Sequence, residues 1–314
     1  MSKTAFIRAA EIWLPTADGT ELVLGSGLYG PLHAFAELSR DTRFRKGEGL
    51  PGEAWAARHP IVMRSLATST FRRIAAAAEA GLTSGIAMPI FSGDAIRAVV
   101  VLFCGDAADQ VGAIEVWSND PETDAQIGLH DGYYGGAELF EMTSRMKRFG
   151  KGFGLPGTVW AAEMPMVFRE IYRSERFLRQ EEARQVGLTL GLGLPFDGDP
   201  GKTWIMVFLS ALGTPIAGRF EVWVPDGSGG LIYETGLSEA ATDVSAAGRP
   251  TRIAAGDGLL GAVLASGLPV ASADCAADAA WLVDPGEPAE AHSALAMPCL
   301  DAAGALKAVT AWRF

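Results

Sequence analysis

One phrase of the sequence occurs three times and constrains the domain organisation. It reads Gly-Glu-Gly-Leu-Pro-Gly from Gly47, Gly-Phe-Gly-Leu-Pro-Gly from Gly152 and, in diverged form, Gly-Asp-Gly-Leu-Leu-Gly from Gly256. The copies lie about 105 residues apart, too far for a solenoid repeat and at a distance typical of a whole domain. We therefore predict three tandem copies of one domain, over residues 1–107, 108–213 and 214–314.

Two further features recur with the phrase. Each copy opens on a predicted strand with the signature Glu-x-Trp, which begins at Glu11, Glu115 and Glu221. Residues 27–64 of the first copy align without a gap with residues 132–169 of the second, and 20 of the 38 pairs are identical. The first two copies are therefore closely alike, and the third has diverged.

The predicted elements follow the same order in each copy. Two strands come first, and a proline near the first turn of the phrase favours a short helix there, because its missing N–H is not needed at that place. A strand, a second helix and a final hairpin follow. We predict the second helix over about 71–80 in copy one and 175–186 in copy two, capped at its C-terminus by Gly81 and Gly187.

Composition and charge exclude several classes of partner. The chain has 37 Asp and Glu against 26 Lys and Arg, a net charge of −11, so it lacks the basic surplus that binds nucleic acid. No apolar run approaches the ~20 residues of a membrane span, and the first residues lack the pattern of a signal peptide. Three cysteines are a sparse, odd set, which suits a reducing compartment. We expect a cytoplasmic protein that binds neither nucleic acid nor a membrane.

The sequence resembles the GAF domain family. The motifs that carry the resemblance are the Trp-bearing strand, Arg-Phe-x-Lys-Gly-x-Gly-Leu-Pro-Gly-x-x-Trp, Ala-Gly-Leu or Val-Gly-Leu, and Met-Pro or Leu-Pro before the last hairpin. They lie at 43–55, 80–82 and 88–89 in copy one, at 148–160, 186–188 and 194–195 in copy two, and at 256–261, 269 and 297–298 in copy three. The resemblance implies three α+β domains of GAF-like (PAS-like) fold, each an antiparallel sheet of about six strands with short helices on one face. It also implies a signalling or regulatory role, since GAF domains are generally small-molecule sensors or dimerising modules.

The chain departs from the family pattern in two ways. Members usually carry a helix before the first strand and another after the last, and the connections 105–112 and 212–218 have no room for them. The sheet face that those helices would cover must pack against a neighbouring copy or a second subunit, so we expect a homodimer. The sequence also has no separate output segment, so we expect a signal to pass by contact with a partner protein.

Aromatic residues and arginines shared by copies one and two form the candidate binding site. Aromatic walls with one or two arginines suit a small anionic or planar ligand. The candidate ligand-binding residues are Tyr29, Phe35, Arg40, Phe44, Trp55 and Arg64, with Arg72, in copy one, and Tyr134, Phe140, Arg145, Phe149, Trp160 and Arg169, with Arg179, in copy two. The alternative is that the aromatics are core residues kept by a shared fold.

Two other site chemistries match the sequence less well. The glycine phrase fits G-x-G-x-x-G, but no buried parallel strand precedes it. We interpret it as a tight turn with close backbone approach rather than as a dinucleotide site. The four histidines do not cluster with cysteines or carboxylates at metal-ligand spacing, and we expect neither a metal nor a cofactor.

Two alternatives to a sensor stay open. Cys275 follows the middle strand of copy three and Cys299 lies on its last hairpin, so both could face one pocket, as in GAF-type free methionine sulfoxide reductases. The cysteine-rich loop of those enzymes is absent and no nearby basic residue would lower a thiol pKa, so we expect a protein that is not an enzyme. The second alternative is a pure protein–protein assembly module.

Overall fold

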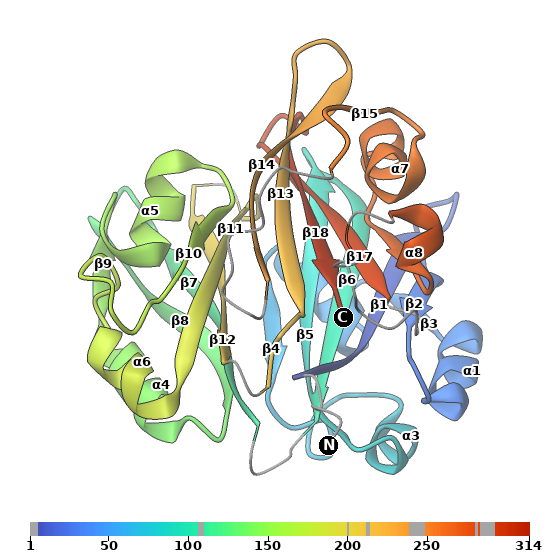
Figure 1. Cartoon of the computed structure of the whole chain (residues 1–314). Coiled ribbons are helices and arrows are strands. Elements are labelled where there is room, and N and C mark those ends of the chain that lie inside the picture. The colour runs from blue at the N-terminus through green and yellow to red at the C-terminus, as the bar shows by residue number, and fades with distance from the viewer. Residues whose placement is uncertain are drawn as a thin grey trace.

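Three six-stranded antiparallel sheets dominate the structure, a computed structural model that describes residues 6–105, 110–199, 201–211, 214–238, 249–279, 282 and 293–314 (Figure 1). The strand orders are β3-β2-β1-β6-β5-β4, β9-β8-β7-β12-β11-β10 and β15-β14-β13-β18-β17-β16. The same arrangement thus occurs three times, and we call its copies unit 1, unit 2 and unit 3. The predicted α+β fold with about six strands in each copy is confirmed.

The elements follow one another in the same order in units 1 and 2, and unit 3 keeps most of that order. Unit 1 contains β1 (Ile7–Pro15), β2 (Glu21–Leu28), α1 (His33–Asp41), β3 (Arg43–Arg45), α2 (Gly49–Ala57), β4 (Ile61–Met63), α3 (Ile74–Glu79), β5 (Leu82–Ser92) and β6 (Ala95–Gly105). Unit 2 contains β7 (Val111–Asn119), β8 (Gln126–Gly135), α4 (Glu138–Met146), β9 (Arg148–Gly150), α5 (Gly154–Ala162), β10 (Met166–Phe168), α6 (Gln180–Val186), β11 (Leu188–Phe196) and β12 (Thr203–Ala211). Unit 3 contains β13 (Arg219–Pro225), β14 (Gly230–Ser238), β15 (Ile253–Ala254), α7 (Gly258–Ser266), β16 (Val270–Ser272), α8 (Cys275–Asp278), β17 (Ala294–Leu300) and β18 (Leu306–Arg313). Among the helices of these described segments, none has the length and apolar character needed to cross a membrane.

The glycine phrase forms the tight turn that leads into α2, α5 and α7. Its first two glycines have positive φ in every unit, +83° for Gly47 and +58° for Gly49 in unit 1. Its third glycine leaves no room for a side chain: a Cβ on Gly52 would lie 2.1 Å from the carbonyl oxygen of Arg45, and the matching distances are 2.1 and 2.3 Å in units 2 and 3. The interpretation of the phrase as a tight turn with close backbone approach is therefore confirmed.

Helices α1 and α4 do not belong to the predicted order of elements. Each buries one side against its sheet, with Phe35, Ala36 and Ser39 in α1 and Phe140, Thr143 and Ser144 in α4. That spacing is helical, so the sequence does hold the signal for these helices. The predicted second helices exist but begin later, at Ile74 and Gln180, because turns precede them.

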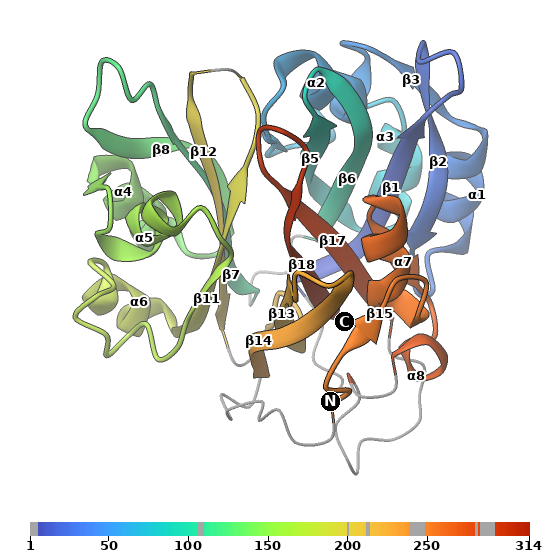
Figure 2. The ribbon, with the colours of Figure 1, turned by 90° about the horizontal axis from the view of Figure 1, so that it is seen from above.

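Both faces of each sheet are buried. In β6, Val101 and Phe103 face the helices of unit 1, whereas Val100 and Leu102 face a core in the middle of the molecule. This central core also takes in residues of β12 and β18, so all three units contribute to it. Figure 2 shows the resulting arrangement, with the helices of units 1 and 2 on the outside and the sheets between them. The sheet face that was expected to need a neighbouring copy or a second subunit is covered by the neighbouring units.

The units contact one another in a closed ring. β4 of unit 1 contacts β8 of unit 2, β10 of unit 2 contacts β14 of unit 3, and β16 of unit 3 contacts β2 of unit 1. Equivalent strands meet at each junction, so the units are related by an approximate threefold axis. Because neighbouring units cover the sheet faces, a second subunit is not required for that purpose, and the homodimer stays a prediction.

Matching segments of the three last hairpins meet at the axis. They are residues 88–91, 194–197 and 297–300, and they line a void of about 30 Å³. That volume corresponds to about one water molecule. The three hairpins thus leave only a small cavity between these segments.

Two histidines lie at the junction of units 1 and 2. His59 stacks on Trp204 with ring centroids 4.1 Å apart, and His130 meets the same indole edge-on at 4.9 Å. Desolvation, followed by the nearby His59, lowers the pKa of His130, although the Asp131 carboxylate acts in the opposite direction. The junction thus favours a neutral imidazole at His130.

We expect the stability of the protein to fall as the pH is lowered from about 7 to about 5, in part through His130. Its pKa is lower in the folded chain than in the unfolded chain, where it is about 6.5. The contribution of this group is therefore complete above pH 6.5 and is lost as the pH falls through the folded value. His130→Phe keeps a ring against Trp204 without a titrating group, so its urea midpoint should change less with pH than that of the wild type. Parallel pH profiles of the two proteins would contradict the assignment.

Candidate functional site

The Glu-x-Trp signature places a carboxylate inside each unit. Glu11 and Trp13 both point to the helix-covered face of β1, and the indole Nε1 donates to Oε2 of the glutamate at 2.9 Å. The pairs Glu115–Trp117 and Glu221–Trp223 form the same bond at the same distance. All three glutamates are fully buried. A buried carboxylate is costly unless a cation pairs with it, so each interior requires one.

In unit 1 the cation is Arg73, the residue before α3. Its Nη1 and Nη2 donate to Oε1 and Oε2 of Glu11 at 2.5 and 2.9 Å, and the two side chains are 2% and 0% exposed. The Ser39 and Tyr29 hydroxyls donate to the same carboxylate at 2.8 and 3.0 Å. Arg73 also donates to the Ser39 oxygen. The four side chains form one closed hydrogen-bond network.

Aromatic rings enclose the guanidinium of Arg73. Its Cζ lies 4.6 Å from the ring centroid of Phe35 and 5.1 Å from that of Phe71. The rings of Trp13, Phe103 and Phe44 follow at 5.4, 5.6 and 5.9 Å. Cation–π attraction is strongest in such desolvated places. The space between the sheet and the helices is thus filled by a cation of the chain itself.

Unit 2 repeats this arrangement with Arg179 and Glu115. The guanidinium donates to both carboxylate oxygens, with Nη2 and Oε2 2.9 Å apart, and to the hydroxyl of Ser144. Tyr134 donates to the carboxylate at 3.1 Å, and the ring of Phe140 lies 4.6 Å from the arginine Cζ. Both members of the ion pair are fully buried. The interiors of units 1 and 2 are therefore closed in the same way.

Unit 3 satisfies its glutamate with different arginines. Arg219 and Arg249 both bind Oε1 of Glu221, with Nη2 atoms 2.6 and 2.7 Å away. Arg249 also lies over the ring of Tyr233, with its Cζ 4.5 Å from the centroid. The third unit has kept the buried carboxylate while its cations come from other positions.

The structure brings some of the predicted ligand-binding residues together and separates the others. Tyr29, Phe35 and Phe44, and in unit 2 Tyr134, Phe140 and Phe149, surround the buried arginines. Trp55 and Trp160 are half-buried on α2 and α5, and Arg40 and Arg145 are exposed on α1 and α4. In this structure the phenylalanine rings contact the internal cation, and the two tyrosine hydroxyls donate to its carboxylate partner. A ligand role for any of these residues stays a prediction.

Arg64 and Arg169 lie at the junctions between units. Arg64 reaches from unit 1 to Asp131 and Glu141 of unit 2, with Nη2–Oδ1 and Nη1–Oε1 distances of 2.7 and 2.6 Å. Nη2 of Arg169 donates to the carbonyl oxygen of Gly236 in unit 3 at 2.9 Å. In the structure these equivalent arginines link neighbouring units of the ring.

The predicted site residues do not include all of the residues at the centre of the network. Glu11, Glu115 and Arg73 are absent from that set, which includes Arg72 instead. Unit 2 has one additional residue before its arginine, so Arg179 matches Arg73 and not Arg72. Two signals point to the network: the Glu-x-Trp strand in all three copies, and a Phe-x-Arg pattern shared by units 1 and 2 at the start of the second helix.

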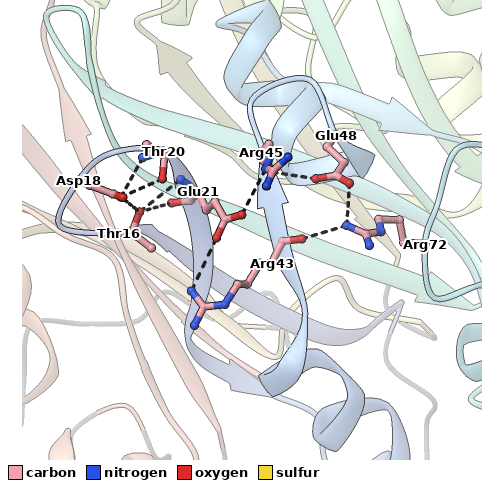
Figure 3. Close-up of polar contacts among 8 residues, drawn as sticks. All are labelled: Thr16, Asp18, Thr20, Glu21, Arg43, Arg45, Glu48 and Arg72. Atoms are coloured by element: carbon pink, nitrogen blue, oxygen red, sulfur yellow. Dashed lines mark hydrogen bonds and ion pairs between the residues drawn. The ribbon is translucent and has the colours of Figure 1, made fainter.

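An open polar groove lies beside the closed interior of unit 1, with a volume of about 550 Å³. Figure 3 shows charged side chains that line it: Glu21 of β2, Arg43 and Arg45 of β3, Glu48 of the turn after β3 and Arg72 of the segment before α3. Arg72 Nη1 and Glu48 Oε1 are 2.8 Å apart. Oε1 of Glu21 lies 3.3 Å from Nε of Arg45, and Oε2 of Glu21 lies 3.9 Å from Nη1 of Arg43. Each of these arginines has a carboxylate beside it, so the groove offers paired charges of both signs.

Comparisons with known proteins found similar solved structures. No protein-family model and no curated protein matches the chain. Solved structures match about a third of it. A GAF domain from A. aeolicus shares 22% identity over 32% of this chain and 59% of that one, with a TM-score of 0.26. The free methionine-R-sulfoxide reductase of Neisseria meningitidis shares 20% over 31% and 52%, with a TM-score of 0.26. NreA of Staphylococcus aureus, mutated in its nitrate binding site, shares 16% over 32% and 74%, with a TM-score of 0.27.

The strand order that occurs three times, with short helices on one face, decides the fold. Each of the three units has a GAF-like fold. The chain spans only 59% and 52% of the first two solved structures, at low identity, so nothing about their ligands or reactions follows for it. Each GAF-like unit has to be judged on its own site.

The two cysteines of GAF-like unit 3 do not share a pocket. Cys275 begins α8 and packs with Trp223 on the helix-covered face of the sheet. Cys299 packs with Val222 on the opposite face, with its sulfur 3.9 Å from the carbonyl oxygen of Pro195 in unit 2. Burial raises the pKa of Cys299 to about 12 and also raises the pKa of Cys275. Both thiols are therefore poor sources of the reactive thiolate.

In the part of the chain that the structure describes, no group of three or more His, Cys, Asp or Glu side chains could hold a metal ion. His292, one of the four histidines, lies outside the described residues.

Proposed function

We propose that this chain is a cytoplasmic, non-enzymatic regulatory protein that binds a partner protein through the outer surfaces of its GAF-like units. The observation that carries the proposal is the closure of the two similar interiors by Arg73 and Arg179. A ligand entering either interior would have to separate a buried ion pair, and leaving one such charge unpaired costs about 3–5 kcal/mol. Binding through the outer surface avoids that cost.

The state of the cysteines supports the non-enzymatic part of the proposal. Cys104, Cys275 and Cys299 are unpaired and buried, and the pKa of each thiol is raised by burial. A thiol reductase needs an accessible thiolate with a lowered pKa. Unpaired cysteines also fit a reducing compartment such as the cytoplasm.

The groove of unit 1 favours a second candidate function, a sensor of a small anionic or planar molecule. In each of its ion pairs at least one of the two side chains is exposed to solvent. In the pair of Arg72 and Glu48 both are, by 49% and 41%. Exposed ion pairs contribute only about 0–1 kcal/mol, so an anionic ligand could displace Glu48 or Glu21 at little cost.

A thermal-shift screen against nucleotides, amino acids and organic anions separates the two candidates. We expect no compound to raise the melting temperature of the wild-type protein by several degrees. A ligand at a hundred times its Kd would add about 2.7 kcal/mol to the free energy of unfolding, so binding would be visible.

Each positive result in this screen has a defined meaning. A shift that Arg72→Ala abolishes would place the ligand in the groove and support the sensor instead. A shift that Arg72→Ala leaves intact would point to an opened interior and overturn the proposal. Arg97→Ala, a substitution of an exposed arginine outside the groove, is the matched control.

A further inference from the structure

One part of the outer surface is charged or small in unit 1 and apolar in unit 2. Ala34, Glu37, Asp41, Glu48 and Arg72 of unit 1 correspond to Leu139, Met142, Met146, Phe153 and Leu178 of unit 2. These five apolar residues are exposed by 45, 56, 69, 68 and 45%, respectively. We call them the apolar surface of unit 2. They account for most of the large apolar side chains that are exposed in the described residues.

The five residues adjoin one another. The three on α4 follow the spacing i, i+3, i+7, which places them on one face of the helix. Three of the corresponding residues of unit 1, Asp41, Glu48 and Arg72, line the polar groove. Their places in unit 2 are taken by Met146, Phe153 and Leu178. Phe153 also lies over Gly150, where unit 1 has an arginine. In Figure 1, α4, α6 and β9 lie together on the side of unit 2 that points away from the other units.

Cations border the apolar surface without carboxylate partners. They are Lys147, Arg148 and Lys151, and none of them forms an ion pair within the described part of the chain. Arg148 corresponds to Arg43, which lies beside Glu21 in unit 1, but the matching residue in unit 2 is Gln126. The nitrogen Nη1 of Arg148 donates to two backbone carbonyls instead. Unit 2 thus lacks, at the rim of its apolar surface, the neutralising carboxylate that unit 1 has at the same place.

The fold itself does not require these apolar side chains. Unit 1 adopts the same strand order and the same helices with charged side chains at four of the five positions. Exposed apolar residues gathered in one place mark an interaction site rather than a packing need. The basic rim lies beside Met146 and Phe153, and it favours carboxylates on whatever covers that end of the surface.

We propose that the apolar surface of unit 2 binds an acidic amphipathic helix of a partner protein. The apolar face of that helix would cover the stripe on α4 and the side chains of Phe153 and Leu178, and its carboxylates would pair with the basic rim. This inference rests on the proposed function and names the surface and the class of partner. A symmetric pair of two copies would bring two basic rims together, and the net charge of −11 opposes an anionic membrane.

Two synthetic peptides and one variant test this proposal. The acidic peptide is an 18-residue helix with leucines at i, i+3, i+4 and i+7 and glutamates on the remaining faces, and the basic peptide has lysines in place of the glutamates. The triple substitution Met146→Asp, Phe153→Glu, Leu178→Arg gives unit 2 the residues that unit 1 carries at these places. The matched control is Leu38→Thr, which replaces an exposed leucine of unit 1 by its counterpart in unit 2.

By fluorescence anisotropy, we expect the full chain to bind the acidic peptide about tenfold more tightly than the basic one. The triple variant should lose about tenfold or more in affinity for the acidic peptide, because it removes apolar contacts and adds two carboxylates. Leu38→Thr should change that affinity by less than about twofold. The melting temperature of each variant verifies its fold, and Phe153→Glu alone replaces the triple variant if the latter unfolds.

Three results would overturn the proposal. Equal affinity for the two peptides, or binding that the substitutions leave unchanged, removes the acidic helix as the partner. Binding to phosphatidylserine vesicles that the triple variant abolishes, without a preference for the acidic peptide, would assign the surface to a membrane. A concentration-dependent dimer that the same variant dissociates would assign it to a second copy of the chain. None of these results depends on the interiors of the units, so they are distinct from a failure in the thermal-shift screen.

Discussion

Replacing Arg73 with methionine should destabilise the protein by about 3–5 kcal/mol, because it leaves the carboxylate of Glu11 buried without its cation. The measurement is urea unfolding followed by tryptophan fluorescence, since Trp13 donates a hydrogen bond to the same carboxylate. The neighbouring Arg72 is a matched control. Its ion pair with Glu48 is exposed to solvent, and Arg72→Met should cost less than about 1 kcal/mol.

A second substitution checks the cause of the effect. Glu11→Gln in the Arg73→Met background removes the remaining charge while keeping an acceptor for Trp13 and Tyr29, so it should restore much of the lost stability. If Arg73→Met unfolds at the same urea concentration as Arg72→Met, the buried pair contributes nothing to stability. The interior of unit 1 would then be easier to open than we infer.

Gly157→Ala should destabilise the protein by about 3 kcal/mol, at the upper end of the usual cost of overpacking. Its Cβ would lie 2.1 Å from the carbonyl oxygen of Gly150, and neither backbone segment can move without disturbing the turn before α5. The measurement is the midpoint of urea unfolding, compared with that of the wild type.

A second glycine of the same phrase separates close approach from backbone strain. Gly152 has a φ of +87° and no atom within 4 Å of a built Cβ, so Gly152→Ala should cost only the roughly 1–2 kcal/mol of a left-handed residue. Equal losses for the two substitutions would show that the contact with Gly150 is not the reason why the third glycine recurs.

Local features of the fold could be predicted well because they depend on neighbouring residues. The glycine phrase, its Trp-bearing helix and the strands around it follow from turn chemistry and alternation, and three copies reinforce each inference. Helices α1 and α4 are the exception. Their buried sides consist of few residues, Phe35, Ala36 and Ser39 in α1, with a serine that propensity alone does not assign to a helix interior.

The closed interiors could not be predicted because they depend on residues far apart in the chain. Glu11 and Arg73 are 62 positions apart, and only the fold brings them together. An arginine next to another arginine gives no sign of which one is buried, and the one-residue difference in length between units 1 and 2 hides the match of Arg73 with Arg179. A buried strand glutamate was the available clue, because such a carboxylate requires a cation.

The arrangement of the three units also could not be predicted from the sequence pattern of any one copy. Strands such as β6 and β12 are apolar on both faces, which indicates cover on both sides but does not say by what. The apolar surface of unit 2 is different. It can be read by comparing copies one and two position by position, once α4 is known to be a helix with one face buried.

The ring of contacts also sets the order in which this chain can complete its fold. The junction of β16 with β2 joins the third unit to the first, so it forms only after nearly the whole chain has left the ribosome. Until then, the nascent first unit exposes the sheet face that the folded protein buries in its central core, with side chains such as Val100 and Leu102. During this time the third unit of another chain can take the same place, because it presents the same strand β16. Domain-swapped oligomers are therefore the misassembly expected of this architecture at high concentration, and dilution should suppress them.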